Sequence, residues 1–215
     1  MPTVTLSQLQ SRVYSRLDNN ALLYTASEVT AAINEQIRVI NLITGYIQTS
    51  VLVPGSSRPN QQWYNVPAGI LVPLRVQFEQ TVLEKYSLTN MGMIAPNWLT
   101  ENTANTGAPV SHWTSVGLQK FAIHPADSVG GNDILVTGIA EPVLLVSGSD
   151  TISFPNEYAE ALEDMAVVTL VMKESGTIFT QASVMYQKFI SKMKQFQRFE
   201  NLRWPAYWIE TVQNK

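Results

Sequence analysis

The segment from Thr25 to Ile47 has an apolar residue at every third or fourth position, which is the spacing of one face of an α-helix. Thr25 and Glu28 have the spacing of a capping box, so the helix is expected to begin just after Thr25. Its β-branched residues lower intrinsic helix propensity, so burial of this face against other segments must stabilise it. The face consists of Val29, Ile33, Ile37, Ile40, Ile43 and Ile47.

Three further segments have helical periodicity, one before this helix and two near the other end of the chain. The first runs from Leu6 to Leu17, where Thr5 and Gln8 predict another capping box. The second begins near Pro155, ends near Glu174 and has an apolar face formed by Tyr158, Leu162, Met165 and Met172. The third runs from about Thr180 to about Asn201, with Met185, Phe189, Met193 and Phe196 on one face.

Between these ends the hydrophobic period changes to two, which indicates β-strands. Leu74, Val76 and Phe78 alternate with polar residues, and the segment from Val82 to Leu88 suggests a partner strand. Further strands are expected at residues 110–115, 119–123 and 134–139, with Gly117, Gly130 and Gly131 at turns.

The helical faces at the two ends must be buried, and the simplest solution brings the ends together. We therefore expect an α+β fold in which a discontinuous four-helix bundle, formed by residues 1–50 and 154–203, carries a small inserted antiparallel β domain at 51–153. Residues 204–215 follow as a C-terminal interaction tail.

Composition excludes several classes of protein. The 215-residue chain has no cysteine, which excludes disulfides, thiol nucleophiles and thiolate metal sites. Charged residues make up 14% of the chain, below the roughly 25% of average domains, and such a surface suits contact with other proteins. The N-terminus lacks a signal-peptide pattern, and no apolar run approaches the about 18 residues of a membrane span, so we expect a soluble protein that is not exported.

No catalytic or cofactor motif is found. His112 and His124 lie on two arms of a predicted hairpin without a third ligand nearby, which argues against a metal site. Phosphate-binding loops and nucleophile elbows are absent, so no cofactor is expected. The acidic residues at the start of the helix expected from Pro155 to Glu174 are interpreted as a solvated cap. These are Glu157, Glu160, Glu163 and Asp164.

The C-terminal region combines basic and aromatic residues. The last 41 residues hold six basic groups against two acidic ones, but six spread charges in a chain of net charge -3 argue against autonomous DNA binding. Trp204, Tyr207 and Trp208 follow the helix expected to end at about Asn201. Pro205 stands among them in the sequence and is incompatible with a continued helix. These aromatics either fold back onto the chain's own core or anchor in another subunit.

The order of features along nearly the whole chain resembles the head-to-tail connector (adaptor) proteins of tailed bacteriophages. The features are a V-x-x-x-I-N run ending at Asn34, then Trp98, Gly107-Ala108-Pro109 before Trp113, a hydrophobic strand ending at Pro125, and the P-x-E-Y entry at Pro155–Tyr158. One departure is Asp127, where the family often has a second proline.

The resemblance implies a structural virion protein, not an enzyme, located in the neck and assembled in the host cytoplasm. Its copies would form a ring, commonly of twelve, that joins the portal protein to a tail or nozzle protein. Genome DNA would pass through the channel without sequence-specific binding, and no membrane would be involved. The resemblance also suggests Trp204, Tyr207 and Trp208 as anchors on the portal or on neighbouring subunits, and Lys188, Lys192 and Arg198 as polar contacts between rings.

Two alternatives remain open at this point. One is another tail-completion or nozzle ring protein, which would assemble by similar physical interactions but bind a different neighbouring protein. The other is a hydrolase or carbohydrate-acting domain that uses acids such as Glu79 or Glu84, which would require two carboxylates roughly 5–10 Å apart in a cleft.

Overall fold

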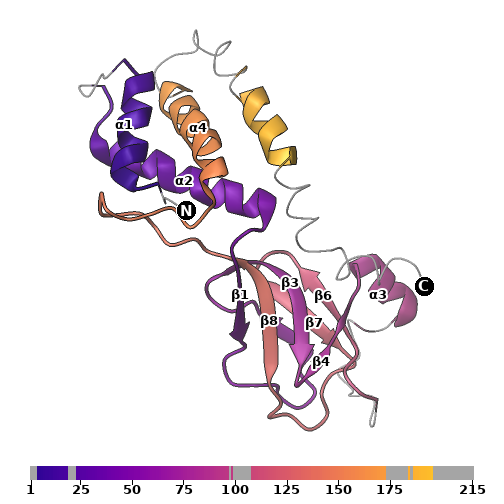
Figure 1. The fold of residues 1–215 in the computed structure, drawn as a ribbon. Coiled ribbons are helices and arrows are strands. Elements are labelled where there is room, and N and C mark those ends of the chain that lie inside the picture. Colours follow the sequence, from indigo (N-terminus) through magenta and orange to yellow (C-terminus); the bar gives the residue numbers. More distant parts are fainter. Residues whose placement is uncertain are drawn as a thin grey trace. The chain divides into compact units, whose positions relative to one another are not determined.

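The computed structural model describes residues 4–18, 23–96, 98, 108–172, 184 and 186–195. These residues form two compact units. One combines residues from 1–47 with residues from 142–206, and the other comprises 48–141. The first unit is helical and the second is built on strands (Figure 1), which confirms the predicted α+β class.

The first two helices begin as their capping boxes predict. Helix α1 (Leu6–Arg16) is capped by Thr5, and α2 (Ala26–Thr44) by Thr25, each with the reciprocal glutamine or glutamate bond in place. The prediction that helical geometry continues to Ile47 is wrong. Gly45 adopts a left-handed conformation (φ 64°) that ends the helix, because glycine has no Cβ to oppose that backbone geometry.

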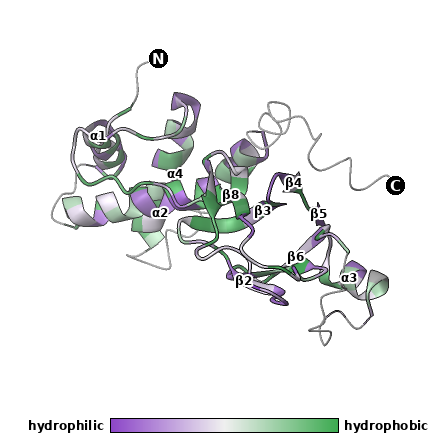
Figure 2. Cartoon of the chain, turned by 90° about the horizontal axis from the view of Figure 1, so that it is seen from below, coloured by the Kyte–Doolittle hydropathy of each residue, from purple (hydrophilic) through white to green (hydrophobic). Residues whose placement is uncertain are grey.

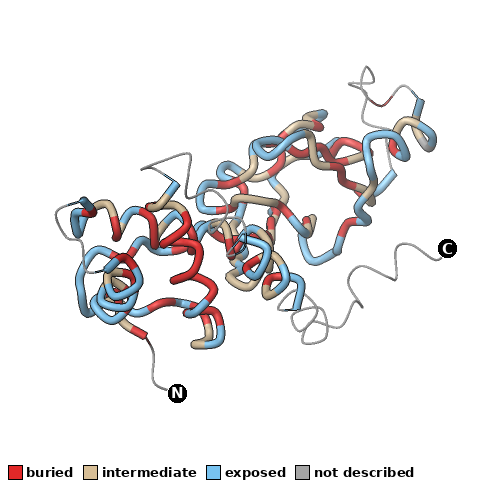
Figure 3. Tube along the Cα trace, turned by 90° about the horizontal axis from the view of Figure 1, so that it is seen from above, coloured by how far each residue is buried: buried red, intermediate tan, exposed pale blue. Residues whose placement is uncertain are grey.

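Helix α4 (Ala159–Met172) lies at the centre of the helical unit. It follows a short 3₁₀ turn, η1 (Asn156–Tyr158), and its residues are buried on almost every side, so that it is red along most of its length in Figure 3. Met172, expected on the buried face, is half-exposed at the last position of the helix. Residues 186–195 are also helical, and their Phe189 and Met193 belong to the same apolar core as α1, α2 and α4.

The second unit contains two four-stranded sheets. One has the order β1-β8-β3-β4, from β1 (Gln48–Leu52), β8 (Ile134–Ala140), β3 (Ile70–Phe78) and β4 (Thr81–Val82). The other has the order β2-β7-β6-β5, from β2 (Trp63–Asn65), β7 (Lys120–His124), β6 (His112–Val116) and β5 (Glu84–Lys85). Strand β8, paired on both sides, is among the most hydrophobic strands, as Figure 2 shows. Because β5 and β6 are parallel, the expectation of a purely antiparallel domain is corrected.

The predicted strands are present, but their partners differ in part from the prediction. The hairpin at Gly117 is confirmed by the antiparallel pairing of β6 and β7. The expected single strand from Val82 to Leu88 is wrong, since β4 and β5 belong to different sheets and Leu88 begins helix α3 (Leu88–Ile94). Leu74 points outward because a register shift interrupts β3 between Pro73 and Arg75.

A polar cluster around Asp127 joins two loops of the strand unit. Its buried carboxylate accepts hydrogen bonds from the Ser57 hydroxyl, from the N–H groups of Val129 and Gly130, and from the Asn132 amide, the last three at 3.0 Å. The Asp127 carbonyl also accepts a bond from Asn60 N–H at 2.7 Å. The residue at which this chain departs from the adaptor pattern is therefore the acceptor that organises this loop.

Gly130 in this loop provides a test of close packing. Its φ is +78°, and a Cβ added there would lie 2.5 Å from Cδ of Pro59. Gly131 has almost the same φ (+82°) but open space around it. We expect Gly130→Ala to lower the free energy of unfolding by about 1–2 kcal/mol more than Gly131→Ala, since only the former adds a steric clash to the backbone strain. Urea unfolding of both variants measures the difference, and equal losses would contradict the packing argument.

Candidate protein interface

The histidines and the candidate acids Glu79 and Glu84 of the strand unit all lie in the described part of the chain. His112 and His124 are directly opposite each other in the β6–β7 register, and the His112 ring lies 3.8 Å from the carboxylate of Glu84. Glu79 lies in the turn that follows β3. Within the described ranges, no group of three histidine or acidic side chains is arranged to hold a metal ion.

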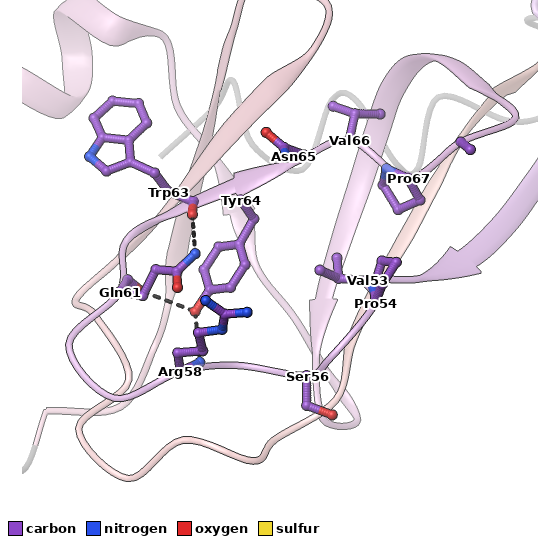
Figure 4. Close-up of a pocket in the computed structure, with 11 residues that line it drawn as sticks. Val53, Pro54, Ser56, Arg58, Gln61, Trp63, Tyr64, Asn65, Val66 and Pro67 are labelled. Atoms are coloured by element: carbon purple, nitrogen blue, oxygen red, sulfur yellow. Dashed lines mark hydrogen bonds between the residues drawn. The ribbon is translucent and has the colours of Figure 1, made fainter.

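A cavity of about 320 Å³ opens beside β2, and Figure 4 shows the residues that line it. The hydroxyl of Tyr64 donates to the Gln61 carbonyl at 3.0 Å and accepts from Arg58 N–H at 3.3 Å. Burial raises the pKa of this phenol, so it stays protonated at neutral pH. The lining contains neither Glu79 nor Glu84 and no other carboxylate, so this cavity lacks the paired acids that glycoside hydrolysis needs.

In the helical unit, an extended segment between β8 and α4 presents apolar side chains to solvent. We call residues 142–147 the strap. Val143, Leu144 and Val146 are 77%, 63% and 81% exposed, whereas Leu145 is buried in the helical core. The segment that follows β8, drawn in orange in Figure 1, runs beneath α2 before the chain turns into α4. Three exposed apolar side chains within four consecutive residues form a patch of the kind that proteins use for contact.

The strap is held in place by side-chain hydrogen bonds to its backbone. The Asn34 amide, from α2, donates to the Leu145 carbonyl and accepts from the Leu145 N–H, both at 2.9 Å. The Asp150 carboxylate accepts from the N–H groups of Val146 and Ser147, both at 2.8 Å. These two N–H bonds lower the pKa of the Asp150 carboxyl, which is therefore ionised at neutral pH. The exposed side chains thus project from an ordered backbone.

A second asparagine on α2 makes the same kind of contact two turns later. Asn41 accepts from the Ile47 N–H at 2.8 Å and donates to the Ile47 carbonyl at 3.4 Å. Its side chain fixes the path of the chain just after α2, as Asn34 fixes the strap. Neither side chain is predicted from the sequence to hold a neighbouring segment, although a polar amide that recurs after seven residues on an apolar helix is a usable signal.

Ion pairs join α1 to α4. Arg12 contacts Glu163 at 2.9 Å, and Arg16 contacts Glu163 at 3.4 Å and also pairs with Asp164. Glu163 and Asp164 are buried, so their interpretation as part of a solvated cap is wrong. Glu160 is largely exposed, as that interpretation expects. The buried carboxylates are stabilised because each has an arginine partner. These partners are at least 148 positions away in sequence, so the spacing of residues within one helix cannot predict the pairs.

Of the basic and aromatic residues that the resemblance suggested as contacts, two lie in the described part of the chain. Lys188 is exposed on the helical segment 186–195. Lys192 is half-buried and binds α4, with its ammonium 2.8 Å from Glu160 and 3.7 Å from Asp164. The hydrogen bond and charge of Lys192 lower the pKa of the Glu160 carboxyl. The remaining predicted residues, Arg198, Trp204, Tyr207 and Trp208, lie outside the described residues.

Reversing the charge of Lys192 should loosen the helical segment 186–195. Lys192→Glu places a third carboxylate beside Glu160 and Asp164, and we expect a loss of about 1 kcal/mol in the local stability of this segment, because the pairs are partly solvated. Hydrogen exchange of the 186–195 amides measures it. Lys194→Glu, at an exposed position, serves as the charge-matched control. Adding Glu160→Lys to Lys192→Glu should restore protection, and failure of this rescue would count against the ion pair.

Comparison with known protein families matches residues 4–208 to the family described as SU10 adaptor protein. The chain belongs to the SU10 adaptor protein family. The resemblance inferred from the order of sequence features is thereby confirmed, and this adaptor is a structural phage protein and a virion component. No curated protein matches its sequence significantly.

The match spans residues of both units of this adaptor, including the strap and the asparagines that hold the chain beside α2. Among the helices that the structure describes, none combines the length and apolar character needed to cross a bilayer. Within the matched region, the strap combines a hydrogen-bonded backbone with exposed apolar side chains.

Proposed function

We propose that this adaptor forms a ring, commonly of twelve copies, that joins the portal to the tail and extends the DNA channel. The observation that carries the proposal is the family match over residues 4–208. In this role the protein acts by assembly and not by catalysis. It lies in the neck of the virion after assembly in the host cytoplasm, with the portal on one side and a tail or nozzle protein on the other. Genome DNA passes through without sequence-specific contacts.

The proposed subunit has two functional parts. A discontinuous four-helix bundle from residues 1–50 and 154–203 forms its base. The inserted β domain expected at 51–153 meets neighbouring proteins, except for its last residues, including the strap, which the structure groups with the helices. Support for the base comes from the single apolar core that α1, α2 and α4 share with Phe189 and Met193. A core built from both chain ends gives a stable platform, because unfolding either end exposes the apolar surface of the other.

The proposed contacts lie toward the C-terminus. Trp204, Tyr207 and Trp208, in the interaction tail 204–215, anchor in the portal or in adjacent subunits, since aromatic side chains supply large contact areas at interfaces. The polar contacts between rings come from Lys188, Lys192 and Arg198. Lys188 is exposed, which suits this role, whereas Lys192 contributes less because its ammonium already binds Glu160.

Mixing the purified adaptor with the portal of its own phage tests this function. We expect rings on the portal by negative-stain electron microscopy and co-migration in size-exclusion chromatography. The triple variant Trp204→Ala, Tyr207→Ala, Trp208→Ala should bind the portal at least about tenfold more weakly, since hot-spot aromatics each contribute about 2 kcal/mol or more. Absence of both rings and co-migration for the unmodified chain would refute the proposal.

A further inference from the structure

The strap has the properties of a preformed binding surface. Its backbone is fixed by Asn34 and Asp150, and Leu145 fastens it to the core, yet the three side chains beside Leu145 remain in solvent. A partner that covers Val143, Leu144 and Val146 does not have to order this segment, so more of the burial free energy is available for binding. From Pro142 to Ser149 the sequence has no charged residue, so the side chains of this run add no ion that an apolar partner would have to desolvate. A charge does contact its backbone, since the Asp150 carboxylate lies against the N–H groups of Val146 and Ser147.

We propose that the strap of one subunit binds the aromatic segment 202–209 of a neighbouring copy; this inference rests on the proposed ring. A ring interface is heterologous and needs two different, complementary patches on each subunit. The strap supplies one patch. The other must be apolar and must come from a different part of the same chain.

The segment 202–209 meets these requirements through its sequence. It reads LRWPAYWI, with five large apolar residues and no acidic residue. The described helix 186–195, which precedes the segment in sequence, belongs to the same unit as the strap. The six residues between Gln195 and Leu202 can span roughly 20 Å when extended, so the segment is not confined to the surface next to helix 186–195.

Disulfide trapping tests the contact cleanly because the chain contains no cysteine. Full-length Val146→Cys and full-length, affinity-tagged Tyr207→Cys are mixed under mild oxidation, and the mixed disulfide is quantified. The control pairs Tyr207→Cys with Val129→Cys, since Val129 is 77% exposed and lies in the strand unit. We expect at least about tenfold more mixed disulfide with Val146→Cys, because a formed interface raises the effective concentration of its two thiols.

A second chain carries Val146→Cys and Tyr207→Cys together and is oxidised at high dilution. An intrachain disulfide that forms there, without an excess of mixed disulfide between chains, would show that the segment binds its own strap and would overturn the proposal. Equal trapping of Val146→Cys and Val129→Cys would overturn it as well. The same samples are also examined for rings on the portal by electron microscopy. Rings without trapping on the strap would refute this contact alone, whereas absence of rings would count against the adaptor function.

Discussion

Replacing Asn34 with alanine is expected to lower the free energy of unfolding of the helical unit by about 2–4 kcal/mol and to release the strap. The substitution removes two hydrogen bonds of 2.9 Å and leaves the Leu145 N–H and C=O without these partners next to the core. Each buried polar group that loses its partner costs about 1–3 kcal/mol. Urea unfolding measures the global loss, and hydrogen exchange at Leu145 reports the local release.

Asn41→Ala is the matched control for this prediction. Asn41 lies on the same helix and holds the backbone of Ile47 through the same pair of amide atoms. Both variants should lose stability, but only Asn34→Ala should speed exchange at Leu145 and reduce trapping between the strap and Tyr207→Cys. Unchanged exchange at Leu145 in Asn34→Ala would show that Leu145 burial alone holds the strap.

The helix starts could be predicted because their determinants are local. A capping box needs residues only three positions apart, so Thr5 with Gln8 and Thr25 with Glu28 located the starts of α1 and α2. The β6–β7 hairpin was equally accessible, since Gly117 separates two short strands. In each case the residues that determine the helix start or the turn lie within a few positions of one another in the sequence.

The candidate interface could not be predicted because its determinants are distant in sequence. Asn34 meets Leu145 across 111 positions, and Arg12 meets Glu163 across 151. From a single sequence, the run that contains the strap is as consistent with a buried strand as with an exposed patch, since periodicity does not show what covers a face. Likewise, four acidic residues near a helix start favour solvent exposure until arginines from another helix neutralise two of them.

The largest expected loss in the strand unit follows removal of the Asp127 carboxylate. Asp127→Ala should lower the free energy of unfolding by about 3–5 kcal/mol, because four donors lose a charged acceptor in a buried loop. Asp127→Asn should lose less, since its amide oxygen can still accept from some of these donors. Urea unfolding followed by tryptophan fluorescence, to which Trp63, Trp98 and Trp113 of this unit contribute, measures these losses.

The same carboxylate predicts how the stability of the strand unit depends on pH. Burial alone would raise the pKa of Asp127, but the hydrogen bonds from Ser57, Val129, Asn132 and Gly130 outweigh it and hold the pKa below its ordinary value of about 4. Because the folded pKa is the lower one, the stabilisation is complete above the unfolded pKa and is lost as pH falls through the folded pKa. The stability difference between the unmodified chain and Asp127→Asn should therefore be constant from pH 7 to about 5 and shrink below about 4. A difference that stays constant down to pH 3 would mean that the hydrogen bonds do not depend on the ionised carboxylate.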